Sequence, residues 1–542
     1  MKKLLCCLLS GVLALSGMCA APVKAQAADY ESYYAKLRQM IADSWNSGNY
    51  SPVKPGGSGG QDFSTKRLIV QTKLGASIAK AIGASQYLLD EDGYCILQFE
   101  QAEQAKAAFE KIKAMAGVTS VEADSIVTAC DSFSATSFRA ASSGHLSWGA
   151  DRIKADDFIG RMSDGQRGNV VTVAVIDTGV TSSHEALSGR MVAGTGMHNG
   201  GSSEDGNGHG THVAGIIADS TRGTKVQIMP IQVLDANGQG SNLTIAAGIQ
   251  WAMQHGANVI NLSLGGYDPS SSHYLDSVIQ KAMDAGIVVV AAAGNDNAST
   301  DRFCPAHVNG VICVSAVDAN DKKASFSNYG SNVSLAAPGV NIKSAGRSGY
   351  VSMSGTSMAA PYVSAAAALV KATDMGATPA SVKQALQNAS DDRGSSGWDS
   401  YYGSGVLNLA NVSTGQENTP PPETSAPETK PETQPDQPDS DKPWKGWQPP
   451  APPEDTPEVP MYAISVSVKT QKVNGKTTAA LVIKTKKDGN QLSVKIDDIP
   501  FDSALSNKGD GNYEVSLKGI GHGTHRYEIV HGDTKKTGSF IY

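Results

Sequence analysis

A serine within a turn of small residues is the first position in this chain that suggests chemistry. Ser357 lies in the segment Gly-Thr-Ser-Met-Ala-Ala-Pro (355–361), before an Ala- and Val-rich run that predicts a buried helix from Ser357 to Ala372. Pro361 suits the first turn of that helix, where its missing N–H costs nothing. Ser357 would then lie at a helix N-terminus, whose unpaired N–H groups and dipole favour an anion. A nucleophile beside an anion site suits acyl transfer, whereas the plainer interpretation is a helix cap.

Three further polar residues lie at or after the ends of predicted strands. Asp177 and Asn295 each end a buried Val- and Ala-rich run. His209 lies in the glycine-rich segment 206–215, which predicts a tight exposed turn at a helix start, with His212 packed inside that helix. A metal site on the two histidines is not favoured, because their spacing is three and no further ligand accompanies them. Taken singly, each residue also has a structural interpretation as a turn or capping residue.

The segments that would position these residues predict a parallel sheet covered by helices. From Trp148 to about Val412, apolar runs alternate with helical segments, and continuous Val and Ile runs indicate strands buried on both faces. Loops at the carboxyl ends of such strands usually carry the chemistry. The predicted strands are Val170–Ile176, Gln227–Val233, Val259–Leu264, Ile287–Ala293 and Val311–Val317.

Together, these motifs resemble the three signatures of the subtilisin-like serine proteases. The signatures are Val-Ile-Asp-Thr-Gly (175–179), His-Gly-Thr-His-Val-Ala-Gly (209–215) and Gly-Thr-Ser-Met-Ala-Ala-Pro (355–361), in the order Asp, His, Ser. The segment 292–295 is similar to the family's oxyanion segment, and 325–330 resembles its proteinase K branch. The resemblance covers Trp148 to Val412. It implies a subtilisin-like three-layer α/β domain with a mostly parallel sheet.

The resemblance also implies a role for each matching residue. Ser357 would be the nucleophile, His209 the general base, and Asp177 the residue that orients His209 and stabilises its cation. Asn295 and the Ser357 N–H would form the oxyanion hole. The resemblance also implies two edge strands that bind the substrate backbone and a first specificity pocket, whose apolar walls favour apolar or uncharged substrate side chains. The residues implied are Gly238, Gln239 and Gly240 in one strand, Ser263, Leu264 and Gly265 in the other, and Ala292, Ala293, Gly294 and Phe303 in the pocket.

The segments before Trp148 predict export and maturation. Residues 1–27, with two lysines, an apolar run and Ala-Gln-Ala, are typical of a secretory signal peptide. Residues 28–65 are polar and predict a weakly structured lead-in. The segment 66–128 has a β-α-β-α-β order and is similar to the core of a subtilase propeptide, a folding helper and intramolecular inhibitor. That similarity assigns residues 28–130 to the propeptide, with the cut between Cys130 and Asp131.

The sequence after Val412, where the resemblance ends, predicts a linker and a second folded module. Residues 413–460 are rich in Pro, Glu and Thr, and 14 of the 24 prolines lie between 420 and 460, so this segment predicts an extended spacer. Residues 461–542 contain short alternating runs separated by Asn-Gly and Asp-Gly, which predict a small β-sandwich. The sequence does not indicate the role of this module, and binding to a surface or polymer is one hypothesis.

Charge and cysteine content limit the partners and cofactors. The net charge of −7 lacks the positive excess that is typical of nucleic-acid-binding proteins. Protein or peptide substrates and the chain's own propeptide are therefore the expected partners. Cys304 and Cys313 are the cysteines outside the signal and propeptide, and either a disulfide or two buried thiols fits them. No Cys/His set accompanies them, so no metal is expected. The short loop 220–226 and Ser334 depart from calcium-binding relatives, so no cofactor is expected either.

The leading hypothesis is a secreted serine endopeptidase made as a self-processing zymogen. Its specificity would be broad, with a preference for an apolar or uncharged residue before the cleaved bond. Association of the secreted protein with the cell surface is left open. Two alternatives are a narrow processing protease and a surface-binding protein in which the C-terminal β module dominates. The second alternative is disfavoured because Asp177, His209, Asn295 and Ser357 are all present.

Overall fold

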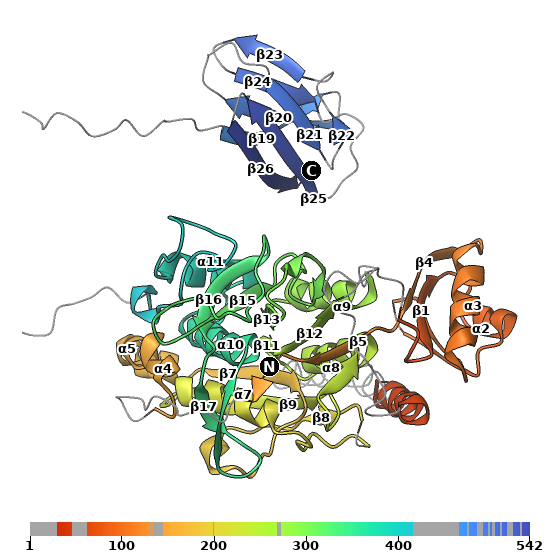
Figure 1. The fold of residues 1–542 in the computed structure, drawn as a ribbon, viewed down its shortest axis with the longest axis horizontal. Helices are drawn as coiled ribbons and strands as arrows, with labels where there is room; N and C mark the ends of the chain where they lie inside the picture. Colours follow the sequence, from red (N-terminus) through yellow and green to blue (C-terminus); the bar gives the residue numbers. More distant parts are fainter. Residues whose placement is uncertain are drawn as a thin grey trace, which may run out of the picture. The chain divides into compact units, whose positions relative to one another are not determined.

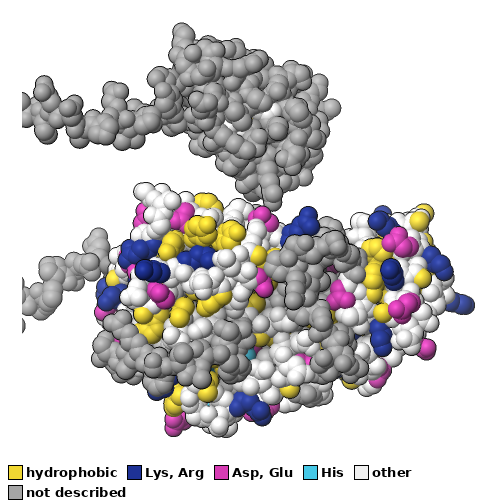
Figure 2. Space-filling model, viewed as in Figure 1, with side chains coloured by type: hydrophobic (Ala, Val, Ile, Leu, Met, Phe, Trp, Pro, Cys, Tyr) yellow, Lys and Arg dark blue, Asp and Glu magenta, His cyan; other side chains and the backbone are white. Residues whose placement is uncertain are grey.

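The computed structural model describes residues 30–45, 62–90, 92–130, 132–133, 145–198, 200–267 and 273–415, and strands between 465 and 541. The chain forms two compact units, Met1–Glu423 and Thr424–Tyr542 (Figure 1). The signal-peptide prediction for residues 1–27, most of the linker prediction and Asp131 lie outside the described residues. On the face shown in Figure 2, acidic and basic side chains are interspersed over the described surface of the first unit.

Seven parallel strands form the central sheet of the first unit, which confirms the predicted parallel sheet. Their residues are almost all buried, as expected for strands covered on both faces. In sheet order, the strands are β16 (Val333–Pro338), β15 (Ile312–Val317), β13 (Val288–Ala292), β11 (Val259–Leu262), β7 (Val170–Asp177), β9 (Lys225–Gln232) and β8 (Thr195–Gly196).

Helices cover this sheet (Figure 1). Two of them are almost entirely buried. All of α7 and nearly all of α10 lie inside the protein. Small residues permit this close packing: a Cβ added to Gly215 of α7 would lie 2.3 Å from the Ser344 hydroxyl oxygen. The helices are α4 (Trp148–Arg152), α5 (Ala155–Arg161), α6 (Asp164–Gly168), α7 (His209–Ser220), α8 (Asn242–Gln254), α9 (His273–Asp284), α10 (Thr356–Thr373) and α11 (Pro379–Ala389).

Smaller sheets flank the central one. The predicted strand Val259–Leu264 ends early, because the chain leaves the central sheet at Ser263 and starts β12 in another sheet. That sheet has the order β10-β5-β12-β14, and a third has the order β17-β18-β6. Their strands are β5 (Ile126–Ala129), β6 (Ser132–Phe133), β10 (Gln239–Ser241), β12 (Leu264–Tyr267), β14 (Phe303–Cys304), β17 (Ile342–Ala345) and β18 (Tyr350–Ser354).

Residues 62–123 form a separate α/β layer with its own apolar core. Its antiparallel sheet has the order β2-β3-β1-β4. The predicted last strand Val118–Val127 is split: β4 ends at Ala123, and the chain continues as β5, which lies between β10 and β12 in another sheet. β2 was not predicted, because three of its four side chains are exposed. The elements are β1 (Arg67–Thr72), α2 (Ser77–Ile82), β2 (Gln86–Leu89), β3 (Tyr94–Gln98), α3 (Ala102–Lys113) and β4 (Val118–Ala123).

A helix at residues 30–44 shows that the predicted lead-in over 28–65 was wrong for its first part. The helix buries one face against the core of the first unit, through Tyr34, Leu37, Met40 and Ile41. These residues recur at helical spacing, which is why a segment of polar composition can still fold on a neighbour. Residues 46–61 lie outside the described part of the chain.

The second unit contains two four-stranded antiparallel sheets, β19-β20-β24-β23 and β22-β21-β25-β26. Ile483, Val494 and Ile529, which come from both sheets, are fully buried. Among the described residues, no helix has the length and apolar character needed to cross a membrane. The strands are β19 (Ser465–Val473), β20 (Lys476–Lys484), β21 (Leu492–Ile496), β22 (Ile499–Pro500), β23 (Leu505–Gly509), β24 (Asn512–Ser516), β25 (Thr524–His531) and β26 (Thr534–Ile541).

Candidate active site

Asp177 and His209 come together because one ends β7 and the other begins α7. His209 Nδ1 lies 2.7 Å from Asp177 Oδ1, and both side chains are fully buried. Burial raises the pKa of the Asp177 carboxyl, and the neighbouring His209 opposes that rise. The exposed turn predicted for His209 was wrong, because the His209 side chain is fully buried. The contact between Asp177 Oδ1 and His209 Nδ1 fixes the orientation of the imidazole.

A buried carboxylate that was not predicted, Asp205, holds the two turns in place. Its Oδ1 accepts hydrogen bonds from the Thr178 hydroxyl (2.9 Å) and the Gly208 N–H (2.8 Å), and its Oδ2 accepts one from the Thr211 N–H (3.0 Å). The Thr178 hydroxyl oxygen in turn accepts from the Gly210 N–H. One carboxylate therefore links the turn after Asp177 to the turn that carries His209.

Ser357 is the second residue of α10 and is fully buried. Its hydroxyl donates to the Ser263 carbonyl at 2.8 Å, and the Ser263 hydroxyl donates to the Ser357 carbonyl at 2.9 Å. Pro361 lies in the second turn of the helix, not in the first as predicted. Because Pro361 has no N–H for the carbonyl four residues earlier, the Ser357 carbonyl is left for Ser263. This reciprocal pair fixes the start of α10 against β12.

The Asn295 amide is oriented by Thr356. Its Oδ1 accepts from both the Thr356 N–H and the Thr356 hydroxyl, each at 2.9 Å. Its Nδ2 is buried and has no hydrogen-bond partner among the described residues. A buried donor left unsatisfied costs about 1–3 kcal/mol, which a purely structural residue would be expected to avoid. The Ser357 N–H donates to the carbonyl oxygen of Cys130 at 3.3 Å, so this donor meets the carbonyl before the predicted cut.

The end of the small α/β layer lies in a groove between two edge strands. β5 pairs antiparallel with β10 on one side, where Thr128 and Val127 face Gln239 and Gly240. It pairs antiparallel with β12 on the other side, where Ala129 faces Leu264. The remaining predicted edge residues also contact this segment: the Gly238 carbonyl accepts from the Ala129 N–H, the Ser263 carbonyl from the Cys130 N–H, and Gly265 lies opposite Thr128.

The chain is held on both sides of the predicted cut. Before it, Cys130 donates its N–H to the Ser263 carbonyl at 3.4 Å and accepts from the Ser357 N–H. After it, Ser132 and Phe133 form β6 and pair with β18. The Cys130 carbonyl, the last described group before the predicted cut, thus lies beside the Ser357 N–H.

The residues predicted for the first specificity pocket lie close together. Ala292, Ala293 and Phe303 are buried, and Gly294 follows them with a φ of +98°. A Cβ added to Gly294 would lie 2.7 Å from the Phe303 ring, and one added to Gly265 would lie 2.3 Å from it. Both glycines therefore allow the backbone to pack directly on the aromatic ring.

Cys304 and Cys313 are both buried thiols that are not bonded to one another, so the disulfide alternative was wrong. They lie on strands of different sheets, β14 and β15. Burial raises the pKa of the Cys313 thiol to about 12. His212 is packed as predicted: its Nε2 lies 3.0 Å from the Ile342 carbonyl, and burial lowers its pKa to about 3.

Comparison with known proteins gives a consistent result. The model of the subtilase family matches residues 168–405. Subtilisin DY of Bacillus licheniformis is 42% identical over 274 residues, which are 48% of this chain and 96% of that protein. An extracellular serine proteinase of Thermus sp. (strain Rt41A) is 43% identical over 249 residues, 44% of this chain and 60% of that protein. A crystal structure of a cold-adapted subtilisin-like serine proteinase is 34% identical, with a TM-score of 0.44, over 49% of this chain and 99% of its own. At such identity over nearly the whole of Subtilisin DY, this chain belongs to the subtilase family of serine peptidases.

Proposed function

We propose that this protein is an exported serine endopeptidase that acts through Asp177, His209 and Ser357 and cuts its own chain between Cys130 and Asp131. One observation carries the proposal: the Cys130 carbonyl accepts a hydrogen bond from the Ser357 N–H while the flanking segments pair as strands with the groove. These contacts of Cys130 and of the segments on either side support the proposal that the chain serves as its own substrate.

The chemistry follows from the residues around that bond. The Ser357 hydroxyl loses its proton to His209 Nε2 as its oxygen adds to the Cys130 carbonyl carbon. Asp177, bonded to His209 Nδ1, stabilises the imidazolium. The Ser357 N–H and Asn295 Nδ2 stabilise the oxyanion. The bond to Asp131 then breaks as His209 protonates the leaving amine, and water hydrolyses the remaining acyl–Ser357 ester by the same route.

The apolar pocket supports a preference for apolar or uncharged residues before the cleaved bond. We expect purified mature protein to cleave peptides with Leu or Met at this position at least about tenfold faster, in kcat/KM, than peptides with Lys. The physical reason is that burying an unpaired ammonium is costly.

A peptide library with matched Leu and Lys members measures this preference. An organophosphorus fluoride, followed by peptide mapping, should abolish activity and label Ser357. A preference for Lys, or a label on another residue with Ser357 unmodified, would contradict the proposal.

The segment 28–130 is proposed to act as an intramolecular inhibitor. Besides filling the groove, it places carboxylates at the N-termini of two helices: Asp124 accepts from the Leu243 N–H of α8 at 2.8 Å, and Glu122 accepts from the Tyr274 N–H of α9 at 3.1 Å. Anions are favoured at such helix ends. Asp92 also forms an ion pair with Lys281 of α9.

The helix at residues 30–44 extends this inhibitory surface beyond the groove. Tyr34 donates its hydroxyl to Gln254 of α8 at 3.2 Å, and Trp45 donates its indole N–H to Asp235 at 3.0 Å. Arg38 donates to the Gly196 carbonyl at 2.9 Å and to the Thr195 hydroxyl at 2.6 Å. None of these four contacts involves Asp177, His209, Asn295 or Ser357, so they would add affinity without engaging the catalytic residues.

Replacing Arg38 by alanine is therefore expected to raise the inhibition constant of the propeptide, added in trans to the mature enzyme, by about tenfold. Two hydrogen bonds from a charged donor are lost, and the net contribution of one such bond is about 1.5–3 kcal/mol. The lower end of that range corresponds to about tenfold. Lys36→Ala, an exposed cation on the same helix, is the matched control and should leave the constant unchanged. Equal inhibition by the Arg38→Ala propeptide and the unaltered one would exclude this role for the helix.

Export is proposed from the signal-like residues 1–27 and from the relative whose name describes it as extracellular. The proposed reaction uses only side chains and backbone groups of this chain and needs no cofactor. The second unit is proposed to bind a surface or polymer, which would set where the enzyme acts.

A further inference from the structure

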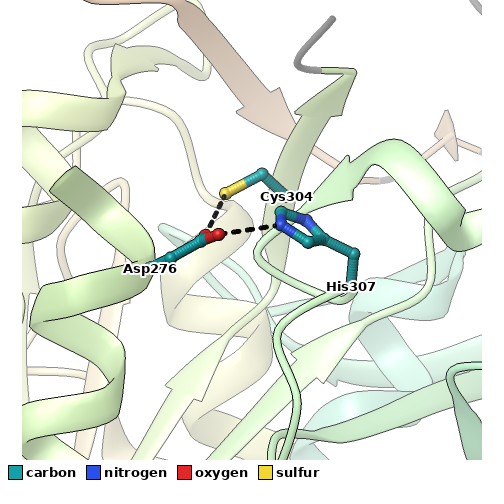
Figure 3. Close-up of side chains that lie close together, drawn as sticks. All are labelled: Asp276, Cys304 and His307. Atoms are coloured by element: carbon teal, nitrogen blue, oxygen red, sulfur yellow. Dashed lines mark hydrogen bonds and ion pairs between the residues drawn. The ribbon is translucent and has the colours of Figure 1, made fainter. Parts of the chain in front are cut away.

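A carboxylate, a thiol and an imidazole that the proposed reaction does not use converge in the first unit (Figure 3). Asp276 lies in the first turn of α9, Cys304 ends β14, and His307 follows three residues later. Asp276 Oδ2 lies 3.1 Å from His307 Nε2, and Cys304 Sγ lies 4.0 Å from Asp276 Oδ1. The three potential ligand atoms all lie within 4.8 Å of one another.

We propose that Asp276, Cys304 and His307 form a binding site for a divalent cation of the zinc class. Zn²⁺ binds thiolate sulfur at about 2.3 Å, imidazole nitrogen at about 2.0–2.1 Å and carboxylate oxygen at about 2.0–2.2 Å. A tetrahedral arrangement at those bond lengths separates the ligand atoms by about 3.4–3.6 Å. The observed separations bracket this range, so side-chain shifts of about 1 Å suffice to bind the ion.

The donor set favours zinc over the hard cations. Thiolate and imidazole suit Zn²⁺, whereas Ca²⁺ and Mg²⁺ prefer oxygen ligands. Binding replaces the proton that the Cys304 thiol shares with Asp276, and that proton leaves to solvent. Three protein ligands leave a fourth position for water.

The burial of the three residues is compatible with entry of an ion from one side. Cys304 is 1% exposed, whereas the side chains of His307 and Asp276 are 16% and 29% exposed. The thiol thus forms the floor of the site, and the imidazole and carboxylate form its solvent-facing rim.

The position of the site gives the ion a mechanical role. Cys304 pairs with Gly266 of β12, and its neighbour Phe303 packs against Gly265 and Gly294 in the pocket wall. An ion bound to Cys304 and Asp276 would join this strand to α9. Occupancy is therefore expected to stabilise the pocket wall and to shield the Cys304 thiol.

The test uses the full chain with Ser357→Ala, so that the protein cannot digest itself and the result is independent of the proposed function. The metal-free protein is titrated with Zn²⁺, and bound zinc is counted by mass spectrometry of the metal. Co²⁺ serves as a spectroscopic probe, because thiolate ligation gives an intense near-ultraviolet charge-transfer band. We expect one zinc per chain and a thiolate band with Co²⁺. Cys304→Ser should abolish the band, and His307→Ala and Asp276→Asn should each weaken zinc binding by at least about tenfold.

Cys313→Ser is the matched control, since it removes a buried thiol on β15, a strand of another sheet, and should leave zinc binding and the cobalt band unchanged. Should Cys304→Ser fail to fold, alkylation of the chain with its cysteines intact, followed by peptide mapping, answers the same question. Zinc should then slow modification of Cys304 at least about tenfold. The proposal is overturned by the absence of a zinc equivalent, by a cobalt band that persists in Cys304→Ser, or by alkylation of Cys304 at the same rate with and without zinc.

Discussion

Replacing His209 by alanine is expected to slow cleavage of the bond between Cys130 and Asp131 by a factor on the order of 10⁶, the loss in kcat seen for the corresponding change in subtilisin. Without an imidazole, nothing in the site accepts the Ser357 proton during attack or returns it to the leaving amine. The effect should appear in the rate and not in the fold, because the contacts that hold β5 in the groove are backbone hydrogen bonds.

The measurement is the first-order loss of full-length precursor after refolding from denaturant, followed by intact mass. His255→Ala is the matched control, because His255 is an exposed histidine that stacks on Trp251 and is not one of the proposed catalytic or substrate-binding residues. It should process at the unaltered rate. A His209→Ala chain that matures within a hundredfold of that rate would exclude His209 as the general base.

Replacing Asp177 by asparagine is expected to lower the same rate by about 10⁴, the size of loss known for this change in a serine protease of another fold. Asparagine keeps the volume but can donate to His209 Nδ1, which would favour the wrong tautomer. It also removes the charge that stabilises the imidazolium. Burial opposes the Asp177 charge, so the folded protein should lose little stability when that charge is removed.

Processing rate and thermal unfolding should be measured together on the Asp177→Asn chain. Asp157→Asn, which neutralises an exposed aspartate on α5, controls for the general loss of one negative charge. If the Asp177→Asn chain processes within tenfold of the unaltered protein, the Asp177–His209 contact is only structural.

The reactive groups could be predicted because each lies in a short local motif at an element end. Asp177 closes a strand of continuous apolar residues, and Ser357 opens an Ala-rich helix, so periodicity and turn chemistry were sufficient to locate them. Their spatial convergence came from resemblance to a family, since spacing along the chain cannot show that Asp177 and His209 meet. Asp205 was missed because its importance lies in hydrogen bonds to three other turn residues, which leave no pattern in sequence.

Other features escaped prediction for different physical reasons. The helix at residues 30–44 has a polar composition and only a narrow apolar face. Its folding depends on the surface that α8 and β8 provide, which the sequence of the helix does not indicate. The position of β5 depends on pairing with β10 and β12, more than 100 residues away. Asp276 lies 28 residues before Cys304, and only the packing of α9 beside β14 brings them together.

The central claim is that Ser357 cuts the bond after Cys130 in its own chain, and intact mass of the Ser357→Ala protein tests it most directly. The substitution removes the attacking oxygen with little change in volume, so the chain should fold and remain a full precursor in a purified, protease-free preparation. The unaltered protein in parallel should lose the segment that ends at Cys130 and begin at Asp131. Cleavage of the purified Ser357→Ala chain at that bond would contradict the account.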